Sequence, residues 1–285
     1  MRKTLWLWLA LVACLAACEP DFDEIRDTDQ RSVTFAVDVS NMFANVLVPE
    51  GDGFVLGDNS GLDDRHRVRV TVRCYDLAGQ LVDMATLFTT MDARPEIRIR
   101  HLDKNKEYQF VLLADVVEFY SEDNFYETWY QLNDKTIENF YITVFHRNDT
   151  AKYNVVSRSI MNLYPENQIV EVDLSPVTYN GYIVFTNYEN KDKIEGYTGC
   201  YQLFRVYSMQ GKNIKGSYYE CGNLSENKVM VPVTATLADN TVLLDVRVRA
   251  GNQSDSTECS FQTSHRPFVT TVDCQELKVV DCTNY

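Results

Sequence analysis

The sequence predicts an all-β protein built from β-sandwiches, and three observations carry that prediction. Apolar and polar residues alternate with a period of two at several places, which is the pattern of a strand with one face in a core. After residue 18 no comparable stretch places apolar residues at i, i+3, i+4 and i+7, the spacing of an amphipathic helix. The chain is 45% hydrophobic and 12% aromatic, so it can fill a core, and its 285 residues suffice for two domains.

The first eighteen residues have the pattern of a bacterial lipoprotein signal peptide. Arg2 and Lys3 precede an apolar run over residues 5–15, and Leu15-Ala-Ala-Cys18 resembles a lipobox. We therefore expect residues 1–17 to be removed and Cys18 to carry the lipid. An ordinary secretory signal peptide with a cysteine at its cleavage site is the alternative. No later stretch approaches the roughly 20 apolar residues that a membrane helix needs.

Residues 18–32 are predicted to be an acidic tether, because Glu19-Pro-Asp-Phe-Asp-Glu24 follows the cysteine directly. Such a tract resembles the signal that sends lipoproteins of the Bacteroidota to the outer face of the outer membrane. We therefore expect a lipid-anchored protein facing the cell exterior; a plain solvated tether is the alternative. With 41 acidic and 27 basic residues the chain has a net charge of −14, which argues against binding to nucleic acid.

From Val33 onward the chain is predicted to form strands. In Val68–Cys74 three valines and the cysteine alternate with arginine and threonine, so the valines are expected in a core and the arginines in water. The same alternation occurs over 170–174 and 244–248. Residues 109–115 are mostly apolar at odd and even positions alike, which predicts a central strand covered on both faces.

An internal repeat indicates that the sandwich occurs twice. Val72–Val82 can be aligned with Phe204–Ile214, which matches Gly79 to Gly211, and a core strand follows each copy at a similar spacing. Each copy is predicted to be a strand, a turn and a strand, with the glycine supplying the positive φ of the turn.

The boundary between the two domains is placed in a stretch of turn residues, 174–181. The predicted N-terminal sandwich covers residues 33–175 and the C-terminal sandwich covers 176–285. A strand-like tail, 269–280, either completes the second domain or is lent to a neighbouring molecule.

Six cysteines remain when Cys14 and Cys18 are set aside: Cys74, Cys200, Cys221, Cys259, Cys274 and Cys282. Cys74 shares the apolar face of its strand and is expected to be a small buried hydrophobe. Disulfides between Cys200 and Cys221 and between Cys274 and Cys282 are predicted; several buried thiols without any disulfide are the alternative. The spacing excludes a Cys-x-x-Cys redox or zinc motif, and no metal or cofactor is expected.

The segment Phe119–Tyr130 interleaves aromatic and acidic residues directly after a core strand. Aromatic rings beside carboxylates suit the face of a sugar, which makes Phe125, Tyr126, Trp129 and Tyr130 candidate ligand-binding residues. The alternative is that the rings pack inward and cover the open end of a sandwich.

Evidence for catalysis is lacking in the sequence. Its four histidines are scattered without metal or Ser-His spacing, so no catalytic residue is assigned and a non-enzymatic protein is expected. A Gly/Asp-rich loop, 51–64, offers Asp58, Asn59, Asp63 and Asp64 to calcium, but it does not fit the EF-hand pattern, and a plain surface loop is the alternative.

Taken together, the lipobox, the acidic tether and the duplicated sandwich resemble the fimbrillin and fimbrial-anchor lipoproteins of the Bacteroidales. The motifs that carry the resemblance are the hairpin YDLAGQLV, residues 75–82, and the strand LDKNKEYQFVLLAD, residues 102–115. The resemblance spans most of residues 33–285 and implies two tandem transthyretin-like (Greek-key) β-sandwich domains.

This resemblance implies a structural subunit or anchor of a surface fimbria, with the outer membrane and other fimbrial subunits as partners. In that family, shaft subunits lose an N-terminal segment to an Arg-specific protease, and a neighbour's strand fills the groove; anchors keep their lipid. Arg26, Arg31, Arg65 and Arg67 are the candidate cleavage points here. A glycan-binding surface lipoprotein is the alternative function, with a host or glycan ligand.

Overall fold

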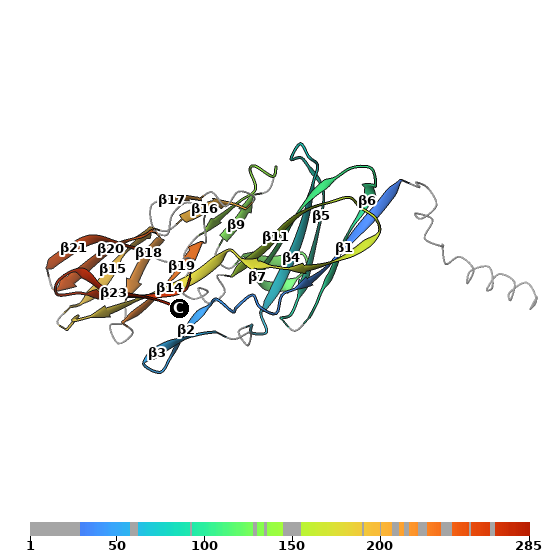
Figure 1. The fold of residues 1–285 in the computed structure, drawn as a ribbon. Helices are drawn as coiled ribbons and strands as arrows, with labels where there is room; N and C mark the ends of the chain where they lie inside the picture. The colour runs from blue at the N-terminus through green and yellow to red at the C-terminus, as the bar shows by residue number, and fades with distance from the viewer. Residues whose placement is uncertain are drawn as a thin grey trace, which may run out of the picture.

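The computed structural model shows an elongated all-β protein (Figure 1). It describes residues 29–57, 62–91, 93–127, 130–133, 136–144, 155–189, 191–199, 201–206, 211–213, 217–221, 227–234, 241–250, 252–262 and 266–285. Every regular element in these ranges is a strand, which confirms the predicted fold class. Within the same ranges no helix has the length and apolar character needed to cross a membrane.

The N-terminal half forms a pair of facing sheets. Its strands are β1 (Gln30–Asp38), β2 (Leu47–Glu50), β3 (Gly53–Leu56), β4 (His66–Tyr75), β5 (Leu81–Thr89), β6 (Glu96–Asp103), β7 (Tyr108–Ser121), β8 (Asn124–Glu127), β9 (Tyr130–Asn133), β10 (Tyr141–Val144), β11 (Val156–Leu163), β12 (Gln168–Asp173) and β13 (Ser175–Pro176). One sheet has the order β12-β1-β6 and the other the order β13-β11-β7-β4-β5. We call them together the N-terminal sheet pair.

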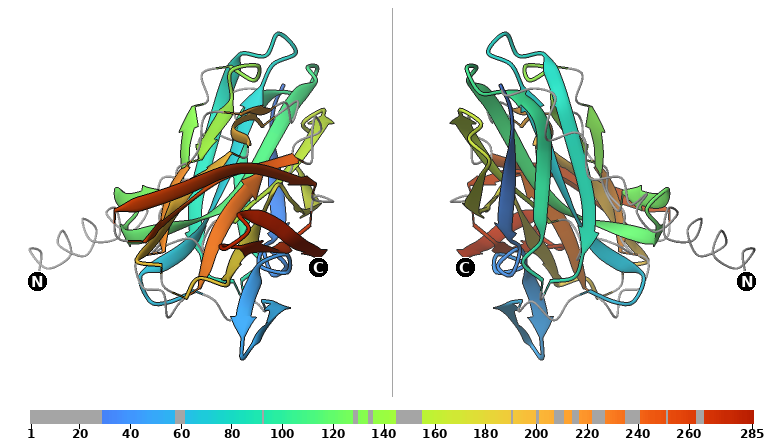
Figure 2. Two further views of the ribbon diagram at one scale, coloured as in Figure 1. Left: turned by 90° about the vertical axis from the view of Figure 1, so that its left-hand side faces the viewer. Right: turned by 90° about the vertical axis from the view of Figure 1, so that its right-hand side faces the viewer.

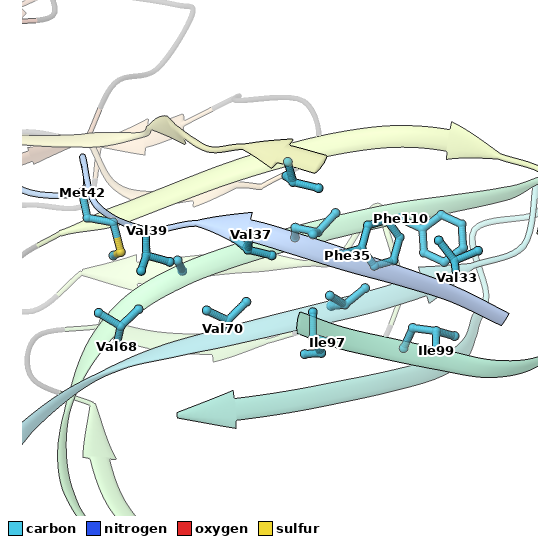
Figure 3. Packing of buried hydrophobic residues seen from close by; sticks show 14 of the residues in the cluster. Val33, Phe35, Val37, Val39, Met42, Val68, Val70, Ile97, Ile99 and Phe110 are labelled. Atoms are coloured by element: carbon cyan, nitrogen blue, oxygen red, sulfur yellow. The ribbon is translucent and has the colours of Figure 1, made fainter. Parts of the chain in front are cut away.

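The core of the N-terminal sheet pair comes from the alternating residues that the sequence predicted. Val68 and Val70 of β4 lie in one cluster with Val33, Phe35 and Val37 of β1 (Figure 3). Val72 belongs to the same cluster, and all six side chains are fully buried. Phe35 and Phe110 lie with ring centroids 5.0 Å apart. A strand with period-two apolar residues therefore packs one face here, and each buried aliphatic side chain contributes about 1.5–3 kcal/mol.

The outer face of β4 and β7 is also buried, which corrects the expectation that the arginines of β4 lie in water. Arg69 and Arg73 are buried, and Arg69 makes two hydrogen bonds to Asp115 of β7, at 3.0 and 2.9 Å. Arg73 lies over the ring of Phe140, 4.6 Å from its centroid. The physical reason is a second layer: Ile137, Phe140 and other residues after β7 cover this face. The prediction that residues 109–115 are covered on both faces is confirmed.

The C-terminal half repeats this arrangement. Its strands are β14 (Thr178–Thr186), β15 (Lys193–Gly199), β16 (Tyr201–Arg205), β17 (Gly211–Asn213), β18 (Ser217–Cys221), β19 (Lys228–Thr234), β20 (Thr241–Ala250), β21 (Gln253–Gln262), β22 (Phe268–Asp273) and β23 (Lys278–Asn284). The sheets β19-β14-β22-β23 and β18-β15-β20-β21 form the C-terminal sheet pair. It encloses a separate core with Ile183, Phe185 and Phe268.

The strand order of the two halves matches element by element. β12-β1-β6 corresponds to β22-β14-β19, with one parallel and one antiparallel neighbour in each case. β11-β7-β4-β5 corresponds to β21-β20-β15-β18, all antiparallel. The sequence therefore folds the same pattern twice, and β7 and β20, the core strands downstream of the repeat, do correspond.

The hairpin alignment between the two halves is wrong. The β4–β5 hairpin corresponds to β15 and β18, whereas β16 and β17 are an insertion between those two strands. Gly79 does have the positive φ, 76°, that its turn needs, but Gly211 lies in strand β17 and not in the turn. The second copy does form two antiparallel strands, β16 and β17, but they are not the counterpart of β4 and β5.

Contacts among the described residues join the two halves of the molecule at several places. The hairpin β16–β17 pairs with β10, which gives a sheet β17-β16-β10-β9 with strands from both halves. β13 adds to β11 just before β14 begins. The hairpin β2–β3 projects from the body of the molecule (Figure 2). The Leu47 N–H donates to Asn180 Oδ1 of β14, and Asn180 Nδ2 donates to the Leu47 carbonyl, both at 2.7 Å. Phe54 of β3 packs on Tyr182 at 4.8 Å.

Candidate functional site

The N-terminal strand β1 is the element on which strand addition would act. β1 lies between β12, to which it is parallel, and β6, to which it is antiparallel. Val33, Phe35 and Val37 point into the core and are fully buried. A strand in this position is held by two hydrogen-bond ladders and by a row of alternating pockets, which are the features that any replacement strand would use.

Of the four arginines considered as cleavage points, Arg65 is the one placed to release β1. Arg26 lies outside the described residues. Arg31 is inside β1 and half-buried, and cleavage there would leave the core residues of the strand in place. Arg67 is half-buried in β4, and its guanidinium donates to the carbonyl of His66 at 2.7 Å. Arg65 is exposed in the turn before β4, downstream of the whole of β1.

The C-terminal tail, residues 269–280, completes the C-terminal sheet pair within the same chain. β22 lies beside β14 in parallel register, and Val272 and Thr270 are fully buried. β23 then pairs with β22 and forms the edge of that sheet. The first of the two roles considered for this tail, completion of its own domain, is the one that the structure contains.

The aromatic segment divides into a packed part and an exposed part. Phe125 of β8 lies 5.0 Å from Phe88 and 5.3 Å from the Arg69 guanidinium, so its ring is partly buried against the sheet. The ring centroid of Phe119 lies 4.8 Å from that of the same Phe88. Trp129 lies outside the described residues, and of Tyr130 the structure gives only its backbone position at the start of β9.

The exposed part consists of Tyr120 and Tyr126, and together with the half-buried Glu118 we call it the tyrosine surface. Tyr120 and Tyr126 expose 55% and 58% of their areas, and their rings lie 6.1 Å apart. The Tyr120 hydroxyl donates to the Glu118 carboxylate at 2.6 Å, and this bond raises the pKa of Tyr120. The sequence pointed to Tyr126 but not to Tyr120 and Glu118. These two residues are separated by one position on β7, so their side chains lie on the same face of the strand, and this spacing could have indicated them.

Among the cysteines, Cys74 is buried in the core as predicted, and burial raises the pKa of its thiol to about 12. Cys274 and Cys282 are both thiols, so the predicted bond between them is not formed. Cys282 pairs with Thr270 while Cys274 follows the far end of β22, which separates them by about 13 Å at ~3.3 Å per residue. Cys18 and Cys200 lie outside the described residues, so the Cys200–Cys221 disulfide stays a prediction.

Within the predicted Gly/Asp-rich loop, residues 51–64, Gly53–Leu56 form strand β3, and Asp63 and Asp64 lie at the turn before β4. Asp63 Oδ1 accepts from the Arg65 backbone N–H at 2.9 Å and lies 2.6 Å from His66 Nδ1. Asp64 is exposed, and Asp58 and Asn59 lie outside the described residues. Nowhere in the described ranges do three His, Cys, Asp or Glu side chains gather as a metal site would require.

Solved structures of bacterial proteins share this fold. Candidate polysaccharide-binding proteins of Bacteroides thetaiotaomicron align with a TM-score of 0.52 at 9% identity, covering 90% of this chain and 95% of theirs. A candidate adhesin of the same species aligns with a TM-score of 0.50 at 11% identity, again over 90% and 95%. The fimbrial anchor protein Mfa2 of Porphyromonas gingivalis has a TM-score of 0.49 at 9% identity, over 90% and 98%.

At these identities the likeness establishes a shared fold. A candidate adhesin and candidate polysaccharide-binding proteins thus share this fold. No family model matches the chain, and no curated protein matches its sequence.

Proposed function

We propose that this protein is a structural subunit or anchor of a surface fimbria, of the fimbrillin type, that assembles by β-strand addition. The observation that carries the proposal is β1, a buried strand held between β12 and β6 with alternating side chains in pockets. The lipobox at Cys18 and the fold shared with a candidate adhesin support it. The protein would work through ladder hydrogen bonds and side-chain pockets, without a catalytic step.

The proposed organisation is a lipid on Cys18, a tether over residues 18–32, and two domains over 33–175 and 176–285. Two separate cores and the change of partner between β13, which pairs with β11, and β14 support a boundary near residue 176. β1 begins at the end of the N-terminal sheet pair remote from the C-terminal pair (Figure 1). A tether leaving that end would direct the C-terminal sheet pair away from the outer membrane, on the cell exterior.

The first test is isolation of the tagged protein from detergent-solubilised outer membrane, run unboiled on a gel, with mass spectrometry of the co-purifying chains. A ladder of detergent-resistant polymers containing other two-sandwich lipoproteins is the expected result. Intact lipid at Cys18 would identify an anchor, and an N-terminus after Arg65 would identify a processed shaft subunit. A lone monomer without partner subunits would refute the proposal.

A second test locks β1 in place. Thr34 of β1 and Arg98 of β6 lie opposite each other in the register, so cysteines at both positions would tie the two strands together. For a shaft subunit the oxidised Thr34→Cys/Arg98→Cys variant should lose the polymer ladder and regain it in reductant. The single variant Thr34→Cys is the matched control and should assemble normally under both conditions.

A glycan-binding surface lipoprotein is the second candidate function, and the tyrosine surface favours it. Two exposed rings, one of them hydrogen-bonded to a carboxylate, offer stacking and hydrogen bonding to a sugar. A fold shared with candidate polysaccharide-binding proteins agrees with this role. Tyr120→Ala and Tyr126→Ala should each weaken retention in polysaccharide affinity gels, whereas Tyr164→Ala, also exposed but outside the tyrosine surface, should not.

The same gels test Trp129 and Tyr130, which the sequence analysis named as candidate glycan-binding residues. Trp129→Ala and Tyr130→Ala should reduce retention if the whole aromatic segment contacts the glycan. Unchanged retention in all four variants would end the glycan hypothesis.

A further inference from the structure

Strand β5 forms an exposed sheet edge with apolar side chains. β5 pairs with β4 and ends the strand order β13-β11-β7-β4-β5, so among the described strands none adds to its other side. Leu81–Met84 are all exposed, and Val82 and Met84 expose 48% and 55% of their areas. A free edge of this kind is a template for another chain, which is why proteins often protect edges with lysine or proline.

The hairpin that carries this edge is fixed in position. The carbonyl of Gly79, at the tip, accepts the backbone N–H of Ile137 at 3.1 Å, and Gln80 forms a β-bridge with Thr136. The Asp76 carboxylate accepts the N–H of Gln80 at 2.8 Å and closes the turn. Because the strand is already ordered, a partner that adds to it would lose little free energy in ordering β5 itself.

The carboxylate of Asp83 gives the β5 edge a negative charge. Exposed Asp83 accepts the backbone N–H of Met84 at 2.8 Å, so this N–H donates to a side chain. Between Arg73 and Arg94 the sequence contains no lysine or arginine. The edge therefore combines negative charge, two exposed apolar side chains and a backbone donor within a few residues.

We propose that the β5 edge binds an extended segment of another protein in which lysine or arginine alternates with apolar residues. The partner's cation would pair with Asp83, and its apolar side chains would cover Val82 and Met84. Its carbonyl would replace Asp83 as the acceptor of the Met84 N–H, which leaves the carboxylate to the cation. A second copy of this chain is a poorer occupant, since its own edge would present the same aspartate. The site is separate from β1, which lies in the opposite sheet, so it does not depend on the fate of that strand.

The test uses two synthetic peptides with blocked ends, Thr-Val-Lys-Val-Thr-Val and the same sequence with glutamate in place of lysine. Binding to the purified full chain is measured by isothermal titration calorimetry. The lysine peptide should bind about tenfold more tightly than the glutamate peptide, because an opposite-charge pair across strands is exchanged for a like-charge pair. In the Asp83→Lys variant this preference should reverse.

A backbone variant separates strand addition from surface adsorption. Met84→Pro removes the N–H that faces the edge, a change that edge strands tolerate, and should weaken the lysine peptide at least tenfold. Ile169→Ser on β12 removes an apolar side chain with 64% exposure elsewhere and should leave binding unchanged. Equal binding of both peptides, no binding, or unchanged binding to Met84→Pro would overturn the proposal. So would a dimer of the free chain that Met84→Pro dissociates.

Should Met84→Pro fail to fold, as judged by its thermal unfolding, the charge reversal in Asp83→Lys decides alone, because an exposed residue tolerates that change. A preference that follows the charge at residue 83 supports the proposal. A preference that does not follow that charge refutes it.

Discussion

Replacing Asp115 with asparagine should lower the free energy of unfolding by about 3 to 5 kcal/mol. Asp115 and Arg69 are both buried and share two hydrogen bonds, at 3.0 and 2.9 Å. Asparagine has nearly the same shape, but it removes the charge that balances the guanidinium. The cost therefore measures a buried positive charge left without its carboxylate, and not a loss of packing.

The measurement is urea-induced unfolding followed by circular dichroism, with the melting temperature as a second readout. At roughly 2–4 °C per kcal/mol for a chain of this class, the melting temperature should fall by about 6 to 20 °C. Arg94→Gln is the matched control. Its guanidinium is exposed and lies 3.6 Å from Asp38 and 3.5 Å from Glu171, so its loss should cost under about 1 kcal/mol.

The double variant Arg69→Met/Asp115→Leu distinguishes a charge effect from a packing effect. Removing both charges together avoids the desolvated, unbalanced ion, so the double variant should be more stable than Asp115→Asn. If Asp115→Asn costs less than about 1 kcal/mol, or if the double variant loses as much as the two single changes together, the pair is not buried as described.

Three further outcomes are expected. Asn180→Ala should cost about 2 to 4 kcal/mol in urea unfolding, because the buried N–H and C=O of Leu47 lose their partner; a cost under 1 kcal/mol would contradict this. Gly79→Ala should cost about 1 to 3 kcal/mol, since φ is 76° and a Cβ would lie 2.8 Å from Ile137 Cγ2; wild-type thermal stability would refute this. Burial raises the pKa of Cys74 from 9.0 to about 12, so the unfolded thiol ionises first and stability should fall as pH rises from about 9 towards 12. Cys74→Ala should flatten that pH dependence, and an unchanged profile would remove Cys74 as its cause.

Periodicity along the chain was enough to predict strands over 68–74, 170–174 and 244–248 and one face of the N-terminal core. Val68, Val70, Val72 and Cys74 lie in that core because side chains on a strand alternate, and this rule depends only on neighbours in sequence. The double-sided burial of residues 109–115 followed from composition in the same way.

The candidate sites could be predicted only in part, because they depend on contacts between distant segments. Tyr126 was identified from the aromatic segment, but its exposure beside Tyr120 and Glu118 is set by how β8 turns back on β7. The alternation pattern could not predict that β5 lies at a sheet edge, because a strand has the same sequence pattern whether one or two strands flank it.

The sequence by itself predicted the all-β class and the buried faces of β4, β12 and β20. Tertiary structure decided what covers the second face of a sheet, and this is why Arg69 and Arg73 are buried although their pattern predicted exposure. It also decided that β16 and β17 pair with β10 of the other half, and that Cys274 and Cys282 stay apart. The physical reason is shared: alternation reports which residues point the same way, whereas burial and pairing depend on the segments that chain reversal brings alongside.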